Sequence, residues 1–319
     1  MEFDSNKQVT LTKYWNNFYQ KKKNVSLAYF SYLLRILKKR IKNIIGYKVN
    51  IQKIKEIVDF SYYSFQKEPI IINLRNKEIE KILIDVYKKN DLNYSGYDHI
   101  KYINEYEKIY RESPVKHLGS GFGFNEGLYL FSLLKITNPT DVIESGVMRG
   151  FSTYIIEKAT NENTRIHCYD ISFNRLEYKS MKAIYNNCDI SEKDPSLLSN
   201  NLFALWDDHV SHYDRLQYSF AKKIKYNLFD DDLGFLNFHS DGWPPIPSLQ
   251  MILNLNKELL NKSTLEWISQ NRLGIINLDE LKKIKIDKKK INYTLLSDLF
   301  DITGYKNHSR TSFVTLTEI

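Results

Sequence analysis

The stretch DVIESGVMRGFST, residues 141–153, decides the fold of this chain. Residues 141–145 have the apolar pattern of a short buried strand. Gly146 and Gly150 then bracket a tight turn, and a helix opens at Ser152. A strand, a glycine turn and a helix N-terminus together allow a backbone to approach a ligand closely. The spacing Gly-x-x-x-Gly differs from the Gly-x-Gly-x-x-Gly of dinucleotide-binding proteins, so we predict a different nucleotide-type α/β fold.

Two acidic residues follow the first two predicted strands. Glu144 stands near the carboxyl end of the first strand, at the edge where open α/β sheets bind ligands. Residues 165–169 form the next predicted strand, and Asp170 ends it. A carboxylate there can accept hydrogen bonds from two vicinal hydroxyls, or it can cap the following turn. With Glu144 and the glycines upstream, ligand binding is the favoured interpretation.

The composition excludes several classes of protein. With 319 residues, the chain can form one large domain, or a domain with a substantial extension. The net charge of +8 comes largely from lysines spread along the chain, and no nucleic-acid-binding motif accompanies it. We therefore predict no nucleic-acid partner.

The cysteines and the chain terminus bear on the location of the protein. The two cysteines, Cys168 and Cys188, belong to no metal-binding spacing and form no disulfide framework, which favours a reducing compartment. The first ten residues lack the apolar core of a signal peptide, and no stretch reaches the length of a membrane span. We predict a cytoplasmic protein without a transmembrane segment, and we leave homo-oligomer formation open.

Residues 1–115 are predicted to form a helical N-terminal extension, and residues 116–319 the α/β domain. Residues 25–37 are apolar at helical spacing and precede a basic run, which favours a packed helix over one lying on a membrane. The tyrosine-rich residues 94–110 either line a carbohydrate site or belong to the core, and the core is the more usual place. The glycines at 119, 121 and 123 form either a lid or a linker.

Acidic clusters follow two later predicted strands. Residues 201–206 form one strand, which is followed by Asp207, Asp208 and His209, and residues 225–229 form the other, which is followed by three aspartates. In a doubly wound sheet, both clusters emerge at the same carboxyl edge as the glycine turn. Their carboxylates can converge on one hard cation. The alternative is that they are solvated loop residues or helix caps. Between the two halves, residues 178–189 are predicted to form a helix followed by a short strand.

The pattern Glu-x-Gly-x-x-x-Gly after the first strand resembles motif I of the class I S-adenosylmethionine (SAM) methyltransferases. The resemblance implies a Rossmann-like doubly wound sheet and a SAM cofactor. In that family the glycine turn passes under the methionine part of SAM, and the acidic residue after the second strand holds the ribose. The residues implied in cofactor binding are Glu144, Ser145, Gly146, Gly150, Ser152, Thr153 and Asp170, with Asp189 near the adenine.

The acidic clusters are similar to those of metal-dependent sugar O-methyltransferases of the macrocin O-methyltransferase type. That resemblance implies Mg²⁺ bound by Asp207, Asp230 and Asp231. The chain also resembles methyltransferase-like proteins with E-S-G-V-x-x-G, F-D-D-H and F-E-D-N segments. Trp206 replaces the first phenylalanine of F-D-D-H, and Asp230 and Asp232 replace the glutamate and asparagine of F-E-D-N. The resemblance covers about residues 115–319 and leaves out the N-terminal third.

Methyl transfer from a sulfonium requires an acceptor hydroxyl close to the methyl group and a base that removes its proton. His209 is the favoured base because its ordinary pKa lies near neutrality, and Asp208 is the second candidate. A capping or structural role for His209 has equal weight.

We therefore expect metal-assisted O-methylation of a sugar, with a small-molecule or saccharide acceptor. The rival interpretations are a metal-dependent glycosyltransferase, a hydroxylase-like enzyme and a non-catalytic SAM-binding scaffold. Among the later features, residues 240–248 form either a wall of the acceptor pocket or a plain connection, and residues 311–317 alternate as a C-terminal strand does.

Overall fold

The computed structural model describes residues 68–115, 122–193, 195, 201–236, 245–255, 257–269 and 272–317. All of these belong to one compact unit that begins at Glu56. The helical patterns predicted before residue 68, the glycines at 119 and 121, and most of the proline-rich loop lie outside the described residues.

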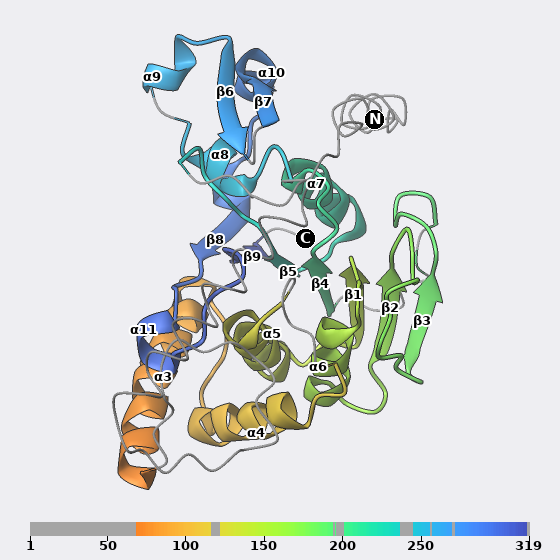
Figure 1. Cartoon of the computed structure of the whole chain (residues 1–319), viewed down its shortest axis with the longest axis vertical. Helices are drawn as coiled ribbons and strands as arrows, with labels where there is room; N and C mark the ends of the chain where they lie inside the picture. Colours follow the sequence, from red (N-terminus) through yellow and green to blue (C-terminus); the bar gives the residue numbers. More distant parts are fainter. Residues whose placement is uncertain are drawn as a thin grey trace, which may run out of the picture. The chain divides into compact units, whose positions relative to one another are not determined.

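A seven-stranded sheet forms the centre of the unit (Figure 1). Its strand order is β3-β2-β1-β4-β5-β9-β8. The first five strands are parallel, and β9 runs antiparallel to both β5 and β8. The order reverses between β1 and β4, which is the switch point of a doubly wound sheet. The predicted Rossmann-like sheet is confirmed, and its strands are β1 (Asp141–Ser145), β2 (Arg165–Tyr169), β3 (Ala183–Asn186), β4 (Leu202–Trp206), β5 (Tyr226–Phe229), β8 (Ile291–Leu295) and β9 (Ser312–Leu316).

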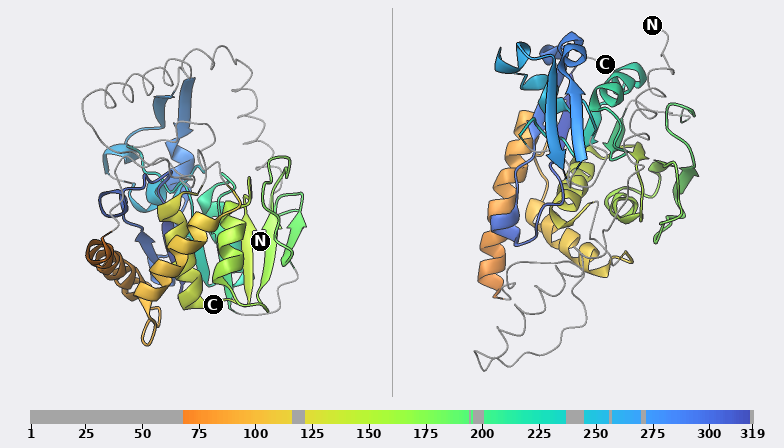
Figure 2. Two further views of the ribbon diagram at one scale, coloured as in Figure 1. Left: turned by 60° about the horizontal axis from the view of Figure 1, so that its bottom comes forward. Right: turned by 45° about the horizontal axis from the view of Figure 1, so that its top comes forward.

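Helices cover both faces of the sheet (Figure 2). Alternate strand residues point to opposite faces, so Val142 enters one core and Ile143 the other. The core around Val142 contains buried residues of α5 (Phe124–Thr137) and α6 (Phe151–Ala159). The core around Ile143 contains Leu216 of α7 (His212–Lys222). Central strands that are buried on both faces explain the continuous apolar runs of the sequence.

Two further helices extend the first of these cores. Helix α3 (Pro69–Lys89) contacts α4 (His99–Glu112), which in turn packs on α5. Tyr106 and Tyr110 of α4 are buried in the core, as the core interpretation of the tyrosine-rich stretch predicts. These helices thus share a core with the α/β domain, while the division at residue 115 stays a prediction.

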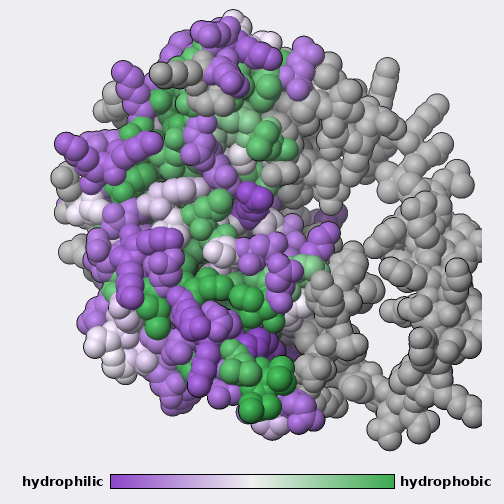
Figure 3. Space-filling view, turned by 90° about the vertical axis from the view of Figure 1, so that its left-hand side faces the viewer, coloured by the Kyte–Doolittle hydropathy of each residue, from purple (hydrophilic) through white to green (hydrophobic). Residues whose placement is uncertain are grey.

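The side of the molecule that carries α3 mixes hydrophilic and hydrophobic residues over its surface (Figure 3). Among its exposed apolar side chains are those of Ile70, Ile71 and Leu74, in the first turns of α3. The other end of α3 is tied to the edge of the sheet, because Asn90 donates a hydrogen bond of 2.9 Å to Thr294 of β8. None of the described helices is both long and apolar enough to cross a membrane.

An insertion between β5 and β8 forms a small subdomain that the sequence analysis did not predict. Its buried residues, Met251, Ile276, Leu278 and Leu281, form a core separate from those of the sheet. The elements are α8 (Leu249–Leu253), α9 (Lys257–Leu260), the antiparallel hairpin of β6 (Thr264–Ser269) and β7 (Arg272–Asn277), α10 (Leu278–Lys283) and the 3₁₀ turn η1 (Lys288–Lys290). Helix α11 (Phe300–Thr303) lies between β8 and β9 in the sequence.

The helix predicted within residues 178–189 is wrong, whereas the short strand after it is confirmed as β3. The backbone N–H groups of Glu177 and Tyr178 donate to the carbonyl oxygen of Arg149, in the glycine turn. Ser180 donates its backbone N–H to the Tyr185 hydroxyl. These donors therefore bond to the turn and to β3, where a helix would have used them internally.

The switch point brings the glycine turn against the end of β4. Gly146 has a φ of +90°, and a Cβ atom built on it would lie 2.0 Å from the backbone oxygen of Asp207. The Asp207 N–H in turn donates to the carbonyl oxygen of Ser145 at 2.8 Å. Only glycine fits here, because both the conformation and the space exclude a side chain.

The substitution Gly146→Ala tests this close approach. Gly96 is a matched control, because it has a φ of +82° with nothing within 4 Å of its missing Cβ. We expect Gly96→Ala to lower the free energy of unfolding by about 1–2 kcal/mol, the cost of left-handed backbone for alanine. Gly146→Ala adds an overlap with backbone and should cost about 3 kcal/mol or more. Equal losses in urea denaturation would contradict the packing described.

Candidate functional site

The buried carboxylate of Glu144 holds the first turn of α6 on β1. It accepts hydrogen bonds from Ser152 Oγ at 2.5 Å, Thr153 Oγ1 at 2.6 Å and Cys168 Sγ at 3.2 Å. Burial raises its pKa to about 7, against the opposing effect of these hydrogen bonds. Glu144, Ser152 and Thr153 are thus one another's partners beneath the turn. Their predicted contact with a cofactor stays a prediction.

The carboxylate of Asp170 ties the glycine turn to the end of β2. One oxygen accepts the N–H groups of Val147 at 2.9 Å and Met148 at 3.0 Å, and the other accepts that of Ser172 at 2.9 Å. These bonds confirm the turn-capping interpretation of this residue, and its ligand-binding role stays a prediction. A carboxylate has about four lone-pair sites, so three donors leave room for about one ribose hydroxyl. Holding two hydroxyls would require one backbone donor to be released.

A buried arginine joins Asp189 to Asp208. Arg215 of α7 forms a salt bridge with Asp189 and donates from Nε to Asp208 at 2.8 Å. Its guanidinium lies over the Trp206 ring, 5.5 Å from the ring centroid. Although burial opposes it, Arg215 lowers the pKa of Asp189, together with hydrogen bonds from Ser191. Asp189 is therefore a salt-bridge partner of Arg215. Its predicted contact with adenine stays a prediction.

The same salt bridge bears on the predicted role of Asp208 as a base. Its carboxylate accepts from Arg215 and also caps the backbone N–H of Val210 at 3.1 Å. Both of its oxygens therefore already accept a hydrogen bond. Between the two predicted bases, this geometry favours His209.

The predicted metal ligands Asp207, Asp230 and Asp231 follow β4 and β5, which are neighbours in the sheet. Burial raises the pKa of Asp207 well above its usual value, and the charges of Asp230 and Asp231 raise it further. Burial also raises the pKa of Asp230, and the charges of Asp231 and Glu126 raise it further. Ionising these carboxylates together in this position is therefore unfavourable. A bound cation would offset that cost.

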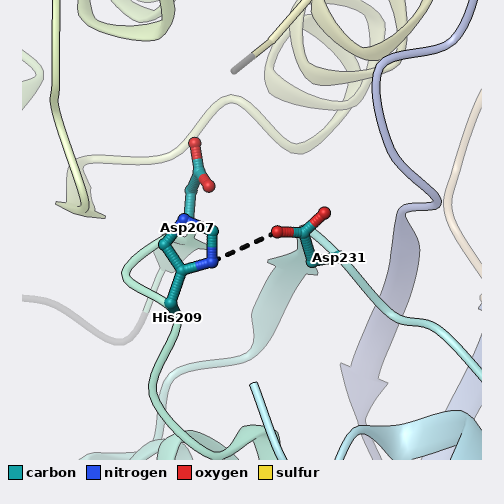
Figure 4. Close-up of side chains that lie close together, drawn as sticks. All are labelled: Asp207, His209 and Asp231. Carbon is teal, nitrogen blue, oxygen red and sulfur yellow. Dashed lines mark ion pairs between the residues drawn. The ribbon is translucent and has the colours of Figure 1, made fainter. Parts of the chain in front are cut away.

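Asp207, His209 and Asp231 converge at this edge (Figure 4). One potential ligand atom from each residue lies within 4.8 Å of the other two. The Nδ1 atom of His209 faces Asp231 Oδ2 at 3.2 Å. Both residues have left-handed backbone, with φ of +56° and +55°. Such conformations cost free energy in residues other than glycine, and they often occur at functional sites.

The remaining aspartates of the second cluster face other partners. Asp230 accepts a hydrogen bond from the hydroxyl of Ser309, in the loop before β9. Asp232 is fully buried and accepts from Tyr293 Oη and the Gln250 backbone, each at 2.8 Å. His212 is also buried, with Nε2 2.9 Å from the backbone oxygen of Asp230. His212 and Asp232 are therefore structural supports of the loop that carries Asp230 and Asp231.

Three residues of this region were missed by sequence reasoning: Glu126, Arg215 and Ser309. Glu126 follows Gly123 at the spacing of a helix-capping box, which was a usable signal. Arg215 falls in a helix that directly follows the first acidic cluster. Ser309 lies 79 positions after Asp230, to which it donates, and nothing in the sequence pattern connects the two.

Comparisons with known proteins found similar solved structures alone. No family model matches the sequence, and no curated protein matches it. Among solved structures, a putative O-methyltransferase from Klebsiella pneumoniae is 8% identical, with a TM-score of 0.39 over 76% of this chain and 98% of that chain. The O-methyltransferase from Bacillus cereus, in complex with S-adenosylhomocysteine (SAH), is 10% identical, with a TM-score of 0.38 over 77% and 100%. TomG from Streptomyces achromogenes, in complex with SAM, is 9% identical, with a TM-score of 0.38 over 76% and 98%. At these values the similarity decides neither fold nor activity, and the fold assignment depends on the strand order of this chain.

The pH dependence of stability tests the burial of Glu144. Its folded-state pKa of about 7 lies above its ordinary 4.5, so its contribution to stability is present below 4.5 and is lost as pH rises through 7. Glu144→Gln removes this loss, and the neighbouring hydroxyls can turn to bond an amide. We expect the Tm of the variant to rise relative to wild type between pH 4.5 and 7.5. Parallel Tm curves would contradict the assignment.

Glu157 is a control of opposite sign. Although burial opposes it, hydrogen bonds from Ser180 and Tyr178 lower its pKa. Its contribution to stability is therefore present above its ordinary pKa and is lost as pH falls. The Tm of Glu157→Gln should fall relative to wild type as pH rises to about 4.5, and the difference should then stay constant up to pH 7.5.

Proposed function

We propose that this chain is a SAM-dependent O-methyltransferase whose cofactor lies over the turn at Gly146. The observation that carries the proposal is the juxtaposition at the switch point: the glycine turn, tied down by Asp170, packs directly against the backbone of Asp207. A cofactor over the turn and an acceptor bound by the acidic cluster would then be neighbours. Methyl transfer needs such proximity, because the reacting atoms must approach to roughly 3–3.5 Å.

We further propose that Asp207 and Asp231 would hold Mg²⁺, with Asp230 supporting them. The donor set fits, because Mg²⁺ is commonly bound by one or two carboxylates while it keeps waters or substrate oxygens. The raised pKa values of Asp207 and Asp230 are the second part of the fit, since burial and neighbouring carboxylates both make their ionised forms costly, and a cation would offset that cost. When bound, the cation would lower the pKa of an acceptor hydroxyl and orient it.

His209 is our proposed general base, and Asp231 is proposed to orient it. Nδ1 of the imidazole faces the Asp231 carboxylate, which leaves Nε2 as the atom that would accept the proton of an acceptor hydroxyl. The side chain is 40% exposed, so an acceptor arriving from solvent would reach it. The convergence of His209 with Asp207 and Asp231 also supports a second role, as a third metal ligand. Imidazole as a ligand would favour a transition-metal ion over Mg²⁺.

We propose a sugar hydroxyl as the acceptor, as a nucleotide sugar, a polysaccharide unit or a glycosylated metabolite. The support for this is the similarity of the acidic clusters to those of macrocin-type sugar O-methyltransferases. A cytoplasmic location is proposed from the cysteine content.

Binding of SAH by calorimetry tests the cofactor. We expect wild-type protein to bind SAH, and Asp170→Asn to bind it about 10–100-fold more weakly, as expected for a lost hydrogen bond to a charged group. Asp98→Asn is the control. Asp98 also accepts a hydrogen bond from a backbone N–H, that of Lys101 at 2.9 Å, but it does so at the start of α4. Wild-type protein that binds a sugar nucleotide and no SAH would instead indicate a glycosyltransferase.

Two substitutions separate the proposed base from the proposed ligands. His209→Ala should lower SAH release from SAM, with a panel of nucleotide sugars as acceptors, by about 10²–10⁴-fold and leave Mn²⁺ affinity within about threefold. Asp231→Asn should weaken Mn²⁺ binding, measured by the free-ion signal in electron paramagnetic resonance, and leave SAH affinity nearly unchanged. If His209→Ala weakens Mn²⁺ binding tenfold or more, His209 is a ligand and our assignment of the base is wrong.

A further inference from the structure

Glu126, in the first turn of α5, is a buried carboxylate that serves two separate segments of the chain. Its Oε2 accepts the N–H of Gly123 at 3.1 Å. Its Oε1 accepts the N–H groups of His308 at 2.7 Å and Ser309 at 3.2 Å, from the loop before β9. The side chain is 1% exposed, so these three backbone donors replace its water shell.

The neighbouring residue of α5, Asn125, forms hydrogen bonds with the same segment before β9. Asn125 is fully buried, donates to the backbone oxygen of Tyr305 at 2.7 Å and accepts from Thr303 Oγ1 at 2.8 Å. The ring of Phe124 stacks on that of Tyr305, with 4.1 Å between centroids. The first turn of α5 thus fixes residues 303–309 over most of their length.

This loop ends at the acidic cluster. The hydroxyl of Ser309 donates to the side chain of Asp230, and the backbone N–H of Asp230 donates to the carbonyl oxygen of Trp206, the residue before Asp207, at 2.9 Å. One residue after Ser309, the carbonyl oxygen of Arg310 accepts the N–H of Asp232 at 2.7 Å. A continuous chain of hydrogen bonds therefore runs from Glu126 through Ser309 and Asp230 to the end of β4, directly before the proposed metal ligand Asp207.

We infer that Glu126 is a positioning residue of the metal site, acting through Ser309 and Asp230 at the end of β4, directly before Asp207. The inference rests on the proposed function, because it concerns the same cation. Residues that orient the ligands of a metal typically contribute 10–100-fold to its affinity. Glu126 and Ser309 would hold Asp230 in one orientation, so that binding a cation need not order these side chains.

The experiment measures Mn²⁺ affinity by electron paramagnetic resonance in the full-length protein. Glu126→Gln offers one acceptor oxygen where three N–H groups need two, so either the Gly123 bond or the loop bonds are lost. We expect Mn²⁺ binding to weaken about 10–100-fold, with SAH affinity within about threefold of wild type. Ser309→Ala should weaken it similarly, and Ser309→Thr, which keeps the hydroxyl, should restore it.

Asp141→Asn is the matched control for loss of a buried carboxylate. Asp141 is 1% exposed at the start of β1, at the opposite end of that strand from the glycine turn, and it pairs with Arg165 and His167. This variant should lower Tm and leave Mn²⁺ affinity unchanged. A purely structural role for Glu126 would instead produce a Tm loss with wild-type Mn²⁺ affinity, and that result overturns the inference while the metal site stands. Wild-type protein that binds no Mn²⁺ overturns both.

Discussion

The contact between two backbones, at Gly146 and Asp207, is the constraint on which the rest of the structure depends. Parallel neighbours β1 and β4 end side by side, and their following loops turn to opposite faces of the sheet. The missing side chain at Gly146 lets those loops touch. Because of that contact, the turn fixed by Asp170 and the carboxylates that follow β4 form one site.

Negative charge gathers on one side of this contact. Burial raises the pKa of Asp207 and of Asp230, and the charge of Asp231 raises both further. The structure compensates some of its carboxylates internally: Arg215 forms salt bridges with both Asp189 and Asp208, and backbone donors bond to Glu126. At the cluster itself, a divalent cation would supply the compensating charge.

The sequence was most informative where periodicity and glycine spacing act over short distances. The strand at 141–145, the turn and the acidic ends of β4 and β5 were predictable, because each depends on neighbouring residues. The helix between β2 and β3 was mispredicted, because Glu177 and Tyr178 bond to Arg149 in a distant turn. Such tertiary hydrogen bonds leave no periodic signal.

The sequence predicted which residues lie near the site better than it predicted the directions and partners of their side chains. Carboxylates at strand ends could be expected to lie close together. The sequence could not show, however, that the Glu144 carboxylate accepts hydrogen bonds from Ser152 and Thr153. Nor could it show that Asp230 accepts a hydrogen bond from Ser309, since the two residues are far apart in the chain. Side-chain direction at a loop depends on backbone angles such as the left-handed φ of His209 and Asp231.

A crystal structure of the protein soaked with SAH and Mg²⁺ tests the central claim most directly. The account predicts the SAH sulfur over the turn at Gly146 and the cation on Asp207 and Asp231, both at the carboxyl edge between β1 and β5. SAH bound elsewhere, or a cation held away from these aspartates, would contradict it.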